Sequence, residues 1–387
     1  MKKLFRRYDV LIFILFLALL VVYLLLANYY HAPRGYYGTV DQPRFADPWI
    51  ARSETVLKGG LLYRDVFTAT PPLTNLLIIP PSLIPILVGN VNPWATLSFM
   101  IFFSLFNLFT AYVLLAMGSG KAAGFWAAVL FLLNPLTFGN TVLRRQDESI
   151  VVFFIALSLL FILRDRNTRA SITIGLGLLI KLSAALVIPV ALWHKRDLRY
   201  LILPPLVFLL GMAPFLLLAG RDAIFWDFTT RDAQHPFQFD GVGLVALWNR
   251  GAGETGQIPL VPIVAIMIVG VGMVAAFLAW KRFGVLEDMI VLVTAVYVLS
   301  PKLHTGYFSL LVMLMAPFVR RWWQIMLYIV FGGMAVVADF YKWPIVDYQS
   351  AFWIMAVVLS LLVTLTIGLI LRRDAGQATG SVIQQLN

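Results

Sequence analysis

The chain has 387 residues, of which 60% are hydrophobic and only 13% are charged. Soluble domains carry about a quarter charged residues, so this composition excludes a soluble enzyme, a disordered chain and a small secreted disulfide scaffold. It is typical of an all-α polytopic membrane protein. The chain has no cysteine, which excludes disulfides and thiolate metal sites. The net charge of +11 has four possible origins, which are binding to nucleic acid, binding to anionic lipid, binding to an anionic substrate, or the orientation of the chain in a membrane.

The first expected membrane span covers residues 10–33, which contain no charged side chain. Four basic residues precede it: Lys2, Lys3, Arg6 and Arg7. Because no A-x-A-type cleavage site follows, we expect an uncleaved helix with a cytoplasmic N-terminus.

Further apolar segments lie near residues 94–117, 122–143, 149–163, 200–220, 258–280, 289–300, 303–319, 322–338 and 350–371. Short basic connectors separate several of them, at Arg164–Arg169, Lys195–Arg199, Lys281–Arg282, Arg320–Arg321 and Arg372–Arg373. Placing these connectors in the cytoplasm predicts about 10 to 13 membrane segments in the plasma or inner membrane. The connectors then carry the net positive charge, which becomes an orientation signal and not a partner signal.

The sequences of two apolar segments do not fit a single straight membrane-spanning helix. Segment 170–193 is one helix long, yet basic clusters flank both ends and Lys181 interrupts its middle. This pattern predicts a hairpin of two half-length helices with Lys181 near the tip. Segment 71–91 carries five prolines, so a broken or kinked element is expected there.

Residues 1–373 are expected to form a single transmembrane domain, and the polar tail 374–387 a disordered cytoplasmic segment. Two long outer loops are predicted, at 30–70 and 221–257. Within the first, residues 49–58 are expected to form a short interfacial helix anchored by Trp49.

Several charged residues are candidates for function. Asp47, in the first outer loop, lies close to the expected membrane plane, where an acid needs a partner or a role; the other charges of this loop also fit surface ion pairs. The Arg144–Glu148 stretch, RRQDE, fits either helix capping or an anion clamp. Lys181 costs at least about 2.5 kcal/mol at a helix centre, which favours a functional role.

A third candidate group follows Ser300-Pro301 and contains Lys302, His304 and Tyr307. Other signatures are missing from the sequence, including a phosphate loop, a dinucleotide fingerprint, G-x-S-x-G and H-E-x-x-H. The histidines are too scattered to indicate zinc, and nothing indicates a nucleic-acid partner.

The order and spacing of several motifs resemble the integral-membrane glycosyltransferases of the GT-C superfamily, especially the polyprenyl-phosphate-sugar-dependent, mannosyltransferase-like branch. The motifs are an aspartate before ARSETVLKGGLLYRDVFTATPPL, then the Gln-Asp cluster, GLGLLIKLSAALVIPVALW and SPKLHTGYFSLLVMLMAP. Together they cover most of residues 1–320. The resemblance implies a bundle of many helices with a catalytic first outer loop.

The same resemblance implies sugar transfer, with mannose as one candidate sugar, from a polyprenyl-phosphate donor to an acceptor on the outer membrane face. It assigns the general base to Asp47, with Asp41 as the second choice. Other matched positions are Asp147, Lys181, His304 and Tyr307. The chain departs from related enzymes at Thr68, Ala69 and Thr70, where a charged pair often precedes Pro-Pro.

The leaving phosphate gathers negative charge, so nearby cations stabilise the transition state. The candidate substrate-binding residues are Arg144, Arg145, Gln146, Asp147, Lys181, Lys302, His304 and Tyr307. Attack opposite the phosphate predicts inversion, with a glycan, lipid or protein as the acceptor. No cofactor is expected, while a divalent metal is left open. The alternatives are a flippase or a polymerase for lipid-linked sugars, or a non-catalytic scaffold.

Overall fold

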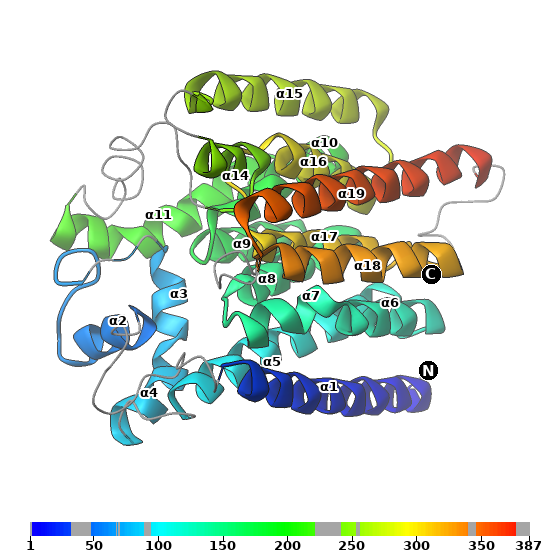
Figure 1. Ribbon diagram of the computed structural model, residues 1–387. Coiled ribbons are helices and arrows are strands. Elements are labelled where there is room, and N and C mark those ends of the chain that lie inside the picture. The colour runs from blue at the N-terminus through cyan, green and yellow to red at the C-terminus, as the bar shows by residue number, and fades with distance from the viewer. Residues whose placement is uncertain are drawn as a thin grey trace.

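The computed structural model describes residues 2–31, 48–66, 68, 70–88, 94–220, 241–252, 256–339 and 346–376. Within these residues every extended regular element is helical, and the β-structure recorded is one isolated bridge between Leu62 and Val66. Most of the long helices run side by side in one bundle (Figure 1). The all-helical prediction is confirmed.

The first half of the chain forms α1 (Lys2–His31), α2 (Pro48–Leu57), α3 (Pro72–Leu77), α4 (Ile79–Val88), α5 (Trp94–Met117), α6 (Ala122–Leu133), α7 (Pro135–Phe138), α8 (Glu148–Leu163), α9 (Asn167–Leu178) and α10 (Val187–Lys195). The second half forms α11 (Arg199–Ala219), α14 (Leu244–Gly251), α15 (Leu260–Lys281), α16 (Val285–Leu299), α17 (Phe308–Met315), α18 (Trp322–Ala338) and α19 (Tyr348–Gly376). Short π or 3₁₀ turns are η2 (Gly139–Leu143), η3 (Leu182–Leu186) and η5 (Thr305–Tyr307).

Five described helices are long and apolar enough to cross a membrane, at Arg7–Asn28, Leu97–Met117, Arg199–Ala219, Val261–Lys281 and Tyr348–Leu369. A sixth span is the pair Ala122–Leu133 and Pro135–Leu143, if this pair, bent by 57°, crosses as one. The sequence predicts about 10 to 13 membrane segments, and some of these are shorter apolar helices in the structure, such as Glu148–Leu163 and Trp322–Ala338. A polytopic membrane protein is therefore confirmed, because several helices have the length and apolarity that a bilayer requires.

The two ends of the bundle differ in chemistry. Helix α1 begins, and α19 ends, at the same end (Figure 1). The basic connectors meet at this end, where the Arg164 Nη2 donates to the Ala116 carbonyl at 2.8 Å and Lys195 pairs with Asp165 at 2.6 Å. We call this end, defined by those four residues, the basic end. The sequence-based prediction from the positive-inside rule places such basic connectors in the cytoplasm.

The segment around Lys181 is a hairpin, as predicted. Helix α9 runs away from the basic end, the chain turns at Lys181, and η3 with α10 brings it back. The return is fixed by the pairing of Lys195 with Asp165 and by the Asn167 amide, which donates to the Asp197 carboxylate at 2.9 Å. Two half-length helices therefore replace one span, and the tip of the hairpin carries Lys181.

The other irregular segment is broken, also as predicted. Helices α3 and α4 replace one span, with Ile78 between them. The expected helix at 49–58 is present as α2, and its Trp49 ring packs edge-on against Phe103 of α5 at a centroid distance of 6.2 Å. Much of the loop at 221–257 and the tail after Gly376 lie outside the described residues.

A glycine sets the distance between the hairpin and α11. A Cβ built on Gly175 would lie 2.6 Å from the Val207 Cβ and 3.0 Å from the Pro204 carbonyl oxygen. We expect Gly175→Ala to cost about 1–3 kcal/mol, because the packed helices must separate. The measurement is the apparent melting temperature in detergent.

The matched control is Gly272→Ala in α15, where an added Cβ would meet nothing within 4 Å. Its melting temperature should stay level or rise, since alanine favours helix by up to about 1 kcal/mol. Equal melting temperatures for Gly175→Ala and wild type would contradict the packing argument.

Candidate functional site

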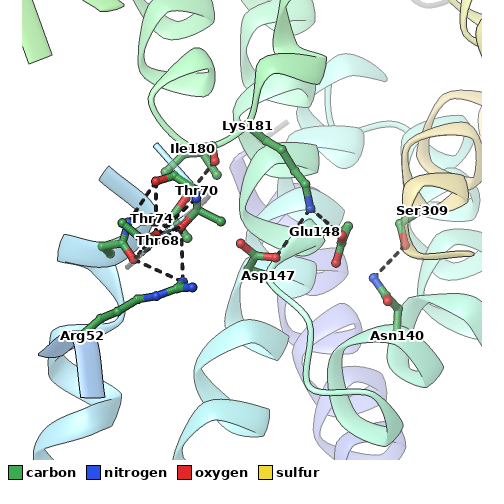
Figure 2. A network of polar contacts seen from close by, with 11 residues as sticks. Arg52, Thr68, Thr70, Thr74, Asn140, Asp147, Glu148, Ile180, Lys181 and Ser309 are labelled. Atoms are coloured by element: carbon green, nitrogen blue, oxygen red, sulfur yellow. Dashed lines mark hydrogen bonds and ion pairs between the residues drawn. The ribbon is translucent and has the colours of Figure 1, made fainter. Parts of the chain in front are cut away.

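Lys181 lies between two carboxylates at the end of the bundle opposite the basic end. Its Nζ is 2.5 Å from the Glu148 Oε1 and 3.7 Å from the Asp147 Oδ1 (Figure 2). The hairpin tip places it there, because α9 has ended and the Lys181 backbone is extended, with φ −159° and ψ 137°. Buried charges need such partners, so the pairing explains how an ammonium is accommodated among apolar helices.

Asp147 occupies the N-cap position of α8, but its side chain caps nothing. One carboxylate oxygen faces Lys181, while the other, Oδ2, is buried and has no hydrogen-bond partner among the described residues. The side chain is only 8% exposed. The helix-capping interpretation of Asp147 is therefore replaced by pairing with Lys181, and one acceptor oxygen is left for a donor group.

Aromatic rings form one wall beside Lys181. The ammonium lies 5.1 Å from the centroid of the Tyr307 ring, a cation–π distance. The His304 ring meets Tyr307 edge-on at 5.3 Å, and Tyr297 lies 6.2 Å from Tyr307. Glu148, Lys181, Tyr297 and Tyr307 line a cavity of about 10 Å³, close to the volume that one water molecule needs.

A second buried network joins the RRQDE stretch to the end of α18. Arg144 forms an ion pair with Asp339 and donates to the Thr305 hydroxyl. Thr305 donates to the Asp339 Oδ2 at 3.1 Å. The Arg144 and Asp339 side chains are 7% and 1% exposed, so the two charges neutralise each other inside the protein.

Gln146 connects the two networks. With its amide nitrogen facing Asn140 and Glu148, it donates at 3.2 and 3.1 Å, and its oxygen accepts from Arg144 at 3.1 Å. A Cβ on Gly306 would lie 2.8 to 2.9 Å from Gln146, Glu148 and Asn140. These polar groups therefore require glycine at residue 306.

The segment that follows α2 docks on the tip of the hairpin. The Leu73 N–H donates to the Leu179 carbonyl at 3.1 Å, and the Thr74 hydroxyl donates to the Ile180 carbonyl at 2.8 Å. These bonds hold the start of α3 beside Lys181. The start of α3 and the lysine are thus parts of one site.

Arg52 of α2 extends this docked segment toward Asp147. Its Nη1 lies 3.4 Å from the Thr70 hydroxyl and 3.5 Å from the Asn75 Oδ1, and its guanidinium lies 5.2 Å from the Trp49 ring centroid. Figure 2 shows Asp147 between this group and Lys181. In this view the Arg52 guanidinium and the threonine residues bonded near it lie on the side of Asp147 away from Lys181.

Most of the predicted site residues converge. Those that meet around Lys181 or join its network are Arg144, Gln146, Asp147, His304 and Tyr307. Arg145 instead places its guanidinium 5.5 Å from the Phe99 ring centroid, and the Lys302 carbonyl accepts from the Ser300 hydroxyl at 2.7 Å. Asp47 and Asp41 lie outside the described residues.

Sequence reasoning missed three charged members of the site. Glu148, the closest partner of Lys181, is named in the sequence analysis only as the end of the RRQDE stretch and not as a site residue. Its position next to Asp147 could have marked it as one. Asp339 is a lone acid directly after the apolar segment 322–338, another usable signal. No feature of the sequence distinguishes Arg52 from the other charged residues of its loop.

Other first-loop charges do match the interpretation as surface ion pairs. Arg64 donates twice to the exposed Asp65 carboxylate at 2.9 Å, and the Leu61 N–H donates to it as well. These bonds, first that from Arg64, lower the pKa of Asp65 to about 2. Among the described residues, no group of three His, Asp or Glu side chains gathers to hold a metal ion.

Residues 67–301 match the family model of glycosyltransferase family 87. The match includes Thr70, Asp147, Glu148 and Lys181, and it covers more than half of the chain. No curated protein matches the chain.

The ion pair of Lys181 with Glu148 can be tested by a double-mutant cycle. Lys181→Met alone leaves buried carboxylates without compensation, so we expect a loss of about 3–5 kcal/mol. Adding Glu148→Gln should recover part of this loss. The measurement is the unfolding free energy of the four proteins in one detergent.

The matched control is the exposed pair Lys58–Glu54, at 3.7 Å with side chains 77% and 42% exposed. Its coupling energy should stay below about 1 kcal/mol. Additive effects of Lys181→Met and Glu148→Gln would show that the two groups do not pair.

Proposed function

The chain belongs to glycosyltransferase family 87, and from this premise we propose that it transfers a sugar from a polyprenyl-phosphate donor to an acceptor hydroxyl. Membership makes the protein a membrane glycosyltransferase of the GT-C type. The observation that carries the proposal is the polar cluster in which the half-buried Lys181 pairs with the buried Asp147 and Glu148, with the half-buried Arg52 on the docked segment beside them. It lies at the end of the bundle away from the basic end, where the outer membrane face is expected.

A lipid-linked donor fits the surroundings of the cluster. The sequence has no phosphate-loop motif for a nucleotide. Helix α4, which follows α3 directly, exposes Leu83, Ile84, Leu87 and Val88. A prenyl chain can pack on such apolar side chains while its phosphate reaches the cluster from the bilayer.

The ion pairs of the site suggest a different role for each charged residue. Lys181 faces two carboxylates and Arg144 is paired with Asp339, so the first task of both cations is to hold acidic groups. The Asp147 Oδ2 can accept a hydrogen bond from a sugar or acceptor hydroxyl. Arg52 offers the planar fork that suits phosphate oxygens.

Three further predicted residues, Arg145, Lys302 and His304, remain candidates for contacts with the donor. The proposal keeps Asp47 as the general base. In the chain, Asp47 directly precedes Pro48, the first residue of α2, which also carries Arg52.

In the proposed reaction, the acceptor oxygen attacks the anomeric carbon from the side opposite the phosphate. The new bond joins that oxygen to the carbon, the bond from the carbon to the phosphate oxygen breaks, and the configuration inverts. The acceptor proton passes to the Asp47 carboxylate. The departing phosphate takes the electron pair, and the Arg52 guanidinium stabilises its growing charge.

Asp47→Asn should abolish sugar transfer while the protein still folds, because an amide cannot accept the proton. The assay supplies purified protein in nanodiscs with radiolabelled polyprenyl-phosphate sugars, mannose first, and membrane extract as the acceptor source. Asp65→Asn is the control, since Asp65 is an exposed acid of the same loop paired with Arg64. Full activity of Asp47→Asn would remove Asp47 from the mechanism, and labelled lipid crossing the bilayer without sugar transfer would favour a flippase.

Arg52→Ala should lower kcat roughly a hundredfold, the range found when one group that stabilises an oxyanion is removed. Steady-state kinetics against donor concentration measure this. Arg64→Ala is the control, because it removes an exposed arginine of the same loop and should change kcat less than twofold. Equal effects of the two variants would remove Arg52 from the phosphate site.

A further inference from the structure

A groove lies far from the polar cluster, on the outside of the bundle. It has a volume of about 560 Å³, within the range of single-ligand sites. Helix α6 forms one wall, and the end of the α17 segment with the first turn of α18 forms the other. Its lining is apolar, including Trp126, Leu130, Val319 and Ile325, except for the guanidinium of Arg320.

The groove lies toward the basic end of the bundle. The end of α18 meets the buried network through Asp339, so its first turn, after Arg320 and Arg321, points the other way. Helix α6 begins five residues after Met117, the last residue of α5. The Arg164 side chain donates to the carbonyl of Ala116, so the last turn of α5 lies at the basic end. The groove is therefore separate from the proposed active site.

The dimensions of the groove match one leaflet of a bilayer. Its α6 wall runs from Ala123 to Leu133, which is about 15 Å at 1.5 Å per residue. The hydrocarbon core is about 30 Å thick, so the wall spans about half of it. Trp126 is 60% exposed and Trp322, beside Arg321, is 77% exposed, as expected of rings at a membrane interface.

We propose that this groove binds one anionic diacyl phospholipid of the leaflet at the basic end. Its acyl chains lie along α6, and its phosphate meets the exposed Arg320 guanidinium. An anionic lipid is preferred because Arg320 attracts a headgroup of net negative charge. Arg321, the next residue in the chain, adds a second positive charge. A zwitterionic headgroup presents a cation as well and gains less from the same contact.

Trp126 reports on the groove directly, because it lines the wall. In nanodiscs, brominated acyl chains quench a tryptophan that they touch. The signal of Trp126 among the 11 tryptophans is the difference between wild type and Trp126→Phe. Brominated phosphatidylglycerol should half-quench this difference signal at a roughly fivefold lower mole fraction than brominated phosphatidylcholine, the preference expected for one basic residue near the surface.

Arg320→Ala should abolish this preference, and Arg320→Lys should keep at least half of it because the charge stays. The control is Arg169→Ala, which removes an exposed arginine of α9 that does not line the groove, and which should leave the preference unchanged. Equal quenching by both lipids in wild type, a preference that survives Arg320→Ala, or its loss in Arg320→Lys would overturn the proposal. Circular dichroism of each variant confirms that the comparison is made between folded proteins.

Discussion

One ammonium group in an apolar bundle constrains the architecture around it. An uncompensated lysine at a helix centre costs at least about 2.5 kcal/mol, so Lys181 requires both a break in its helix and acidic partners. The hairpin supplies the break, and the start of α8 supplies Asp147 and Glu148. The rings of Tyr297 in α16 and Tyr307 in η5, the docked start of α3 and the Gln146 bridge are then all placed around this pair.

Pairing changes what these charges can do. In isolation, Lys181 and Arg144 suggest an anion clamp, but with Glu148 and Asp339 beside them they form compensated networks. Such networks hold groups in place at little reorganisation cost, which is how preorganised sites stabilise developing charge. The proposed reaction therefore relies on Asp147, whose Oδ2 has no hydrogen-bond partner among the described residues, and on Arg52, besides Asp47 as the base.

The two ends of the bundle are specialised in different ways. At one end, buried polar side chains are held by hydrogen bonds between distant segments, such as Thr74 with Ile180. At the basic end, arginines and lysines contact carbonyls and acids near the surface, as Arg164 and Lys195 do. Under the positive-inside rule, this division is the one expected when the proposed substrates arrive at the face opposite the basic end.

The sequence by itself determined the all-helical membrane class, the hairpin at Lys181, the break at 71–91 and the family resemblance, because hydropathy, charge and proline act locally along the chain. Only the tertiary structure decided the partners: Glu148 lies 33 residues from Lys181, and Asp339 lies 195 residues from Arg144. Side-chain pairing across such separations depends on how helices pack, which no local pattern encodes. Arg52 shows this most clearly: it is distinguished from the other arginines of its loop only by its contacts with Thr70 and Asn75, on the segment that docks on the hairpin through Thr74.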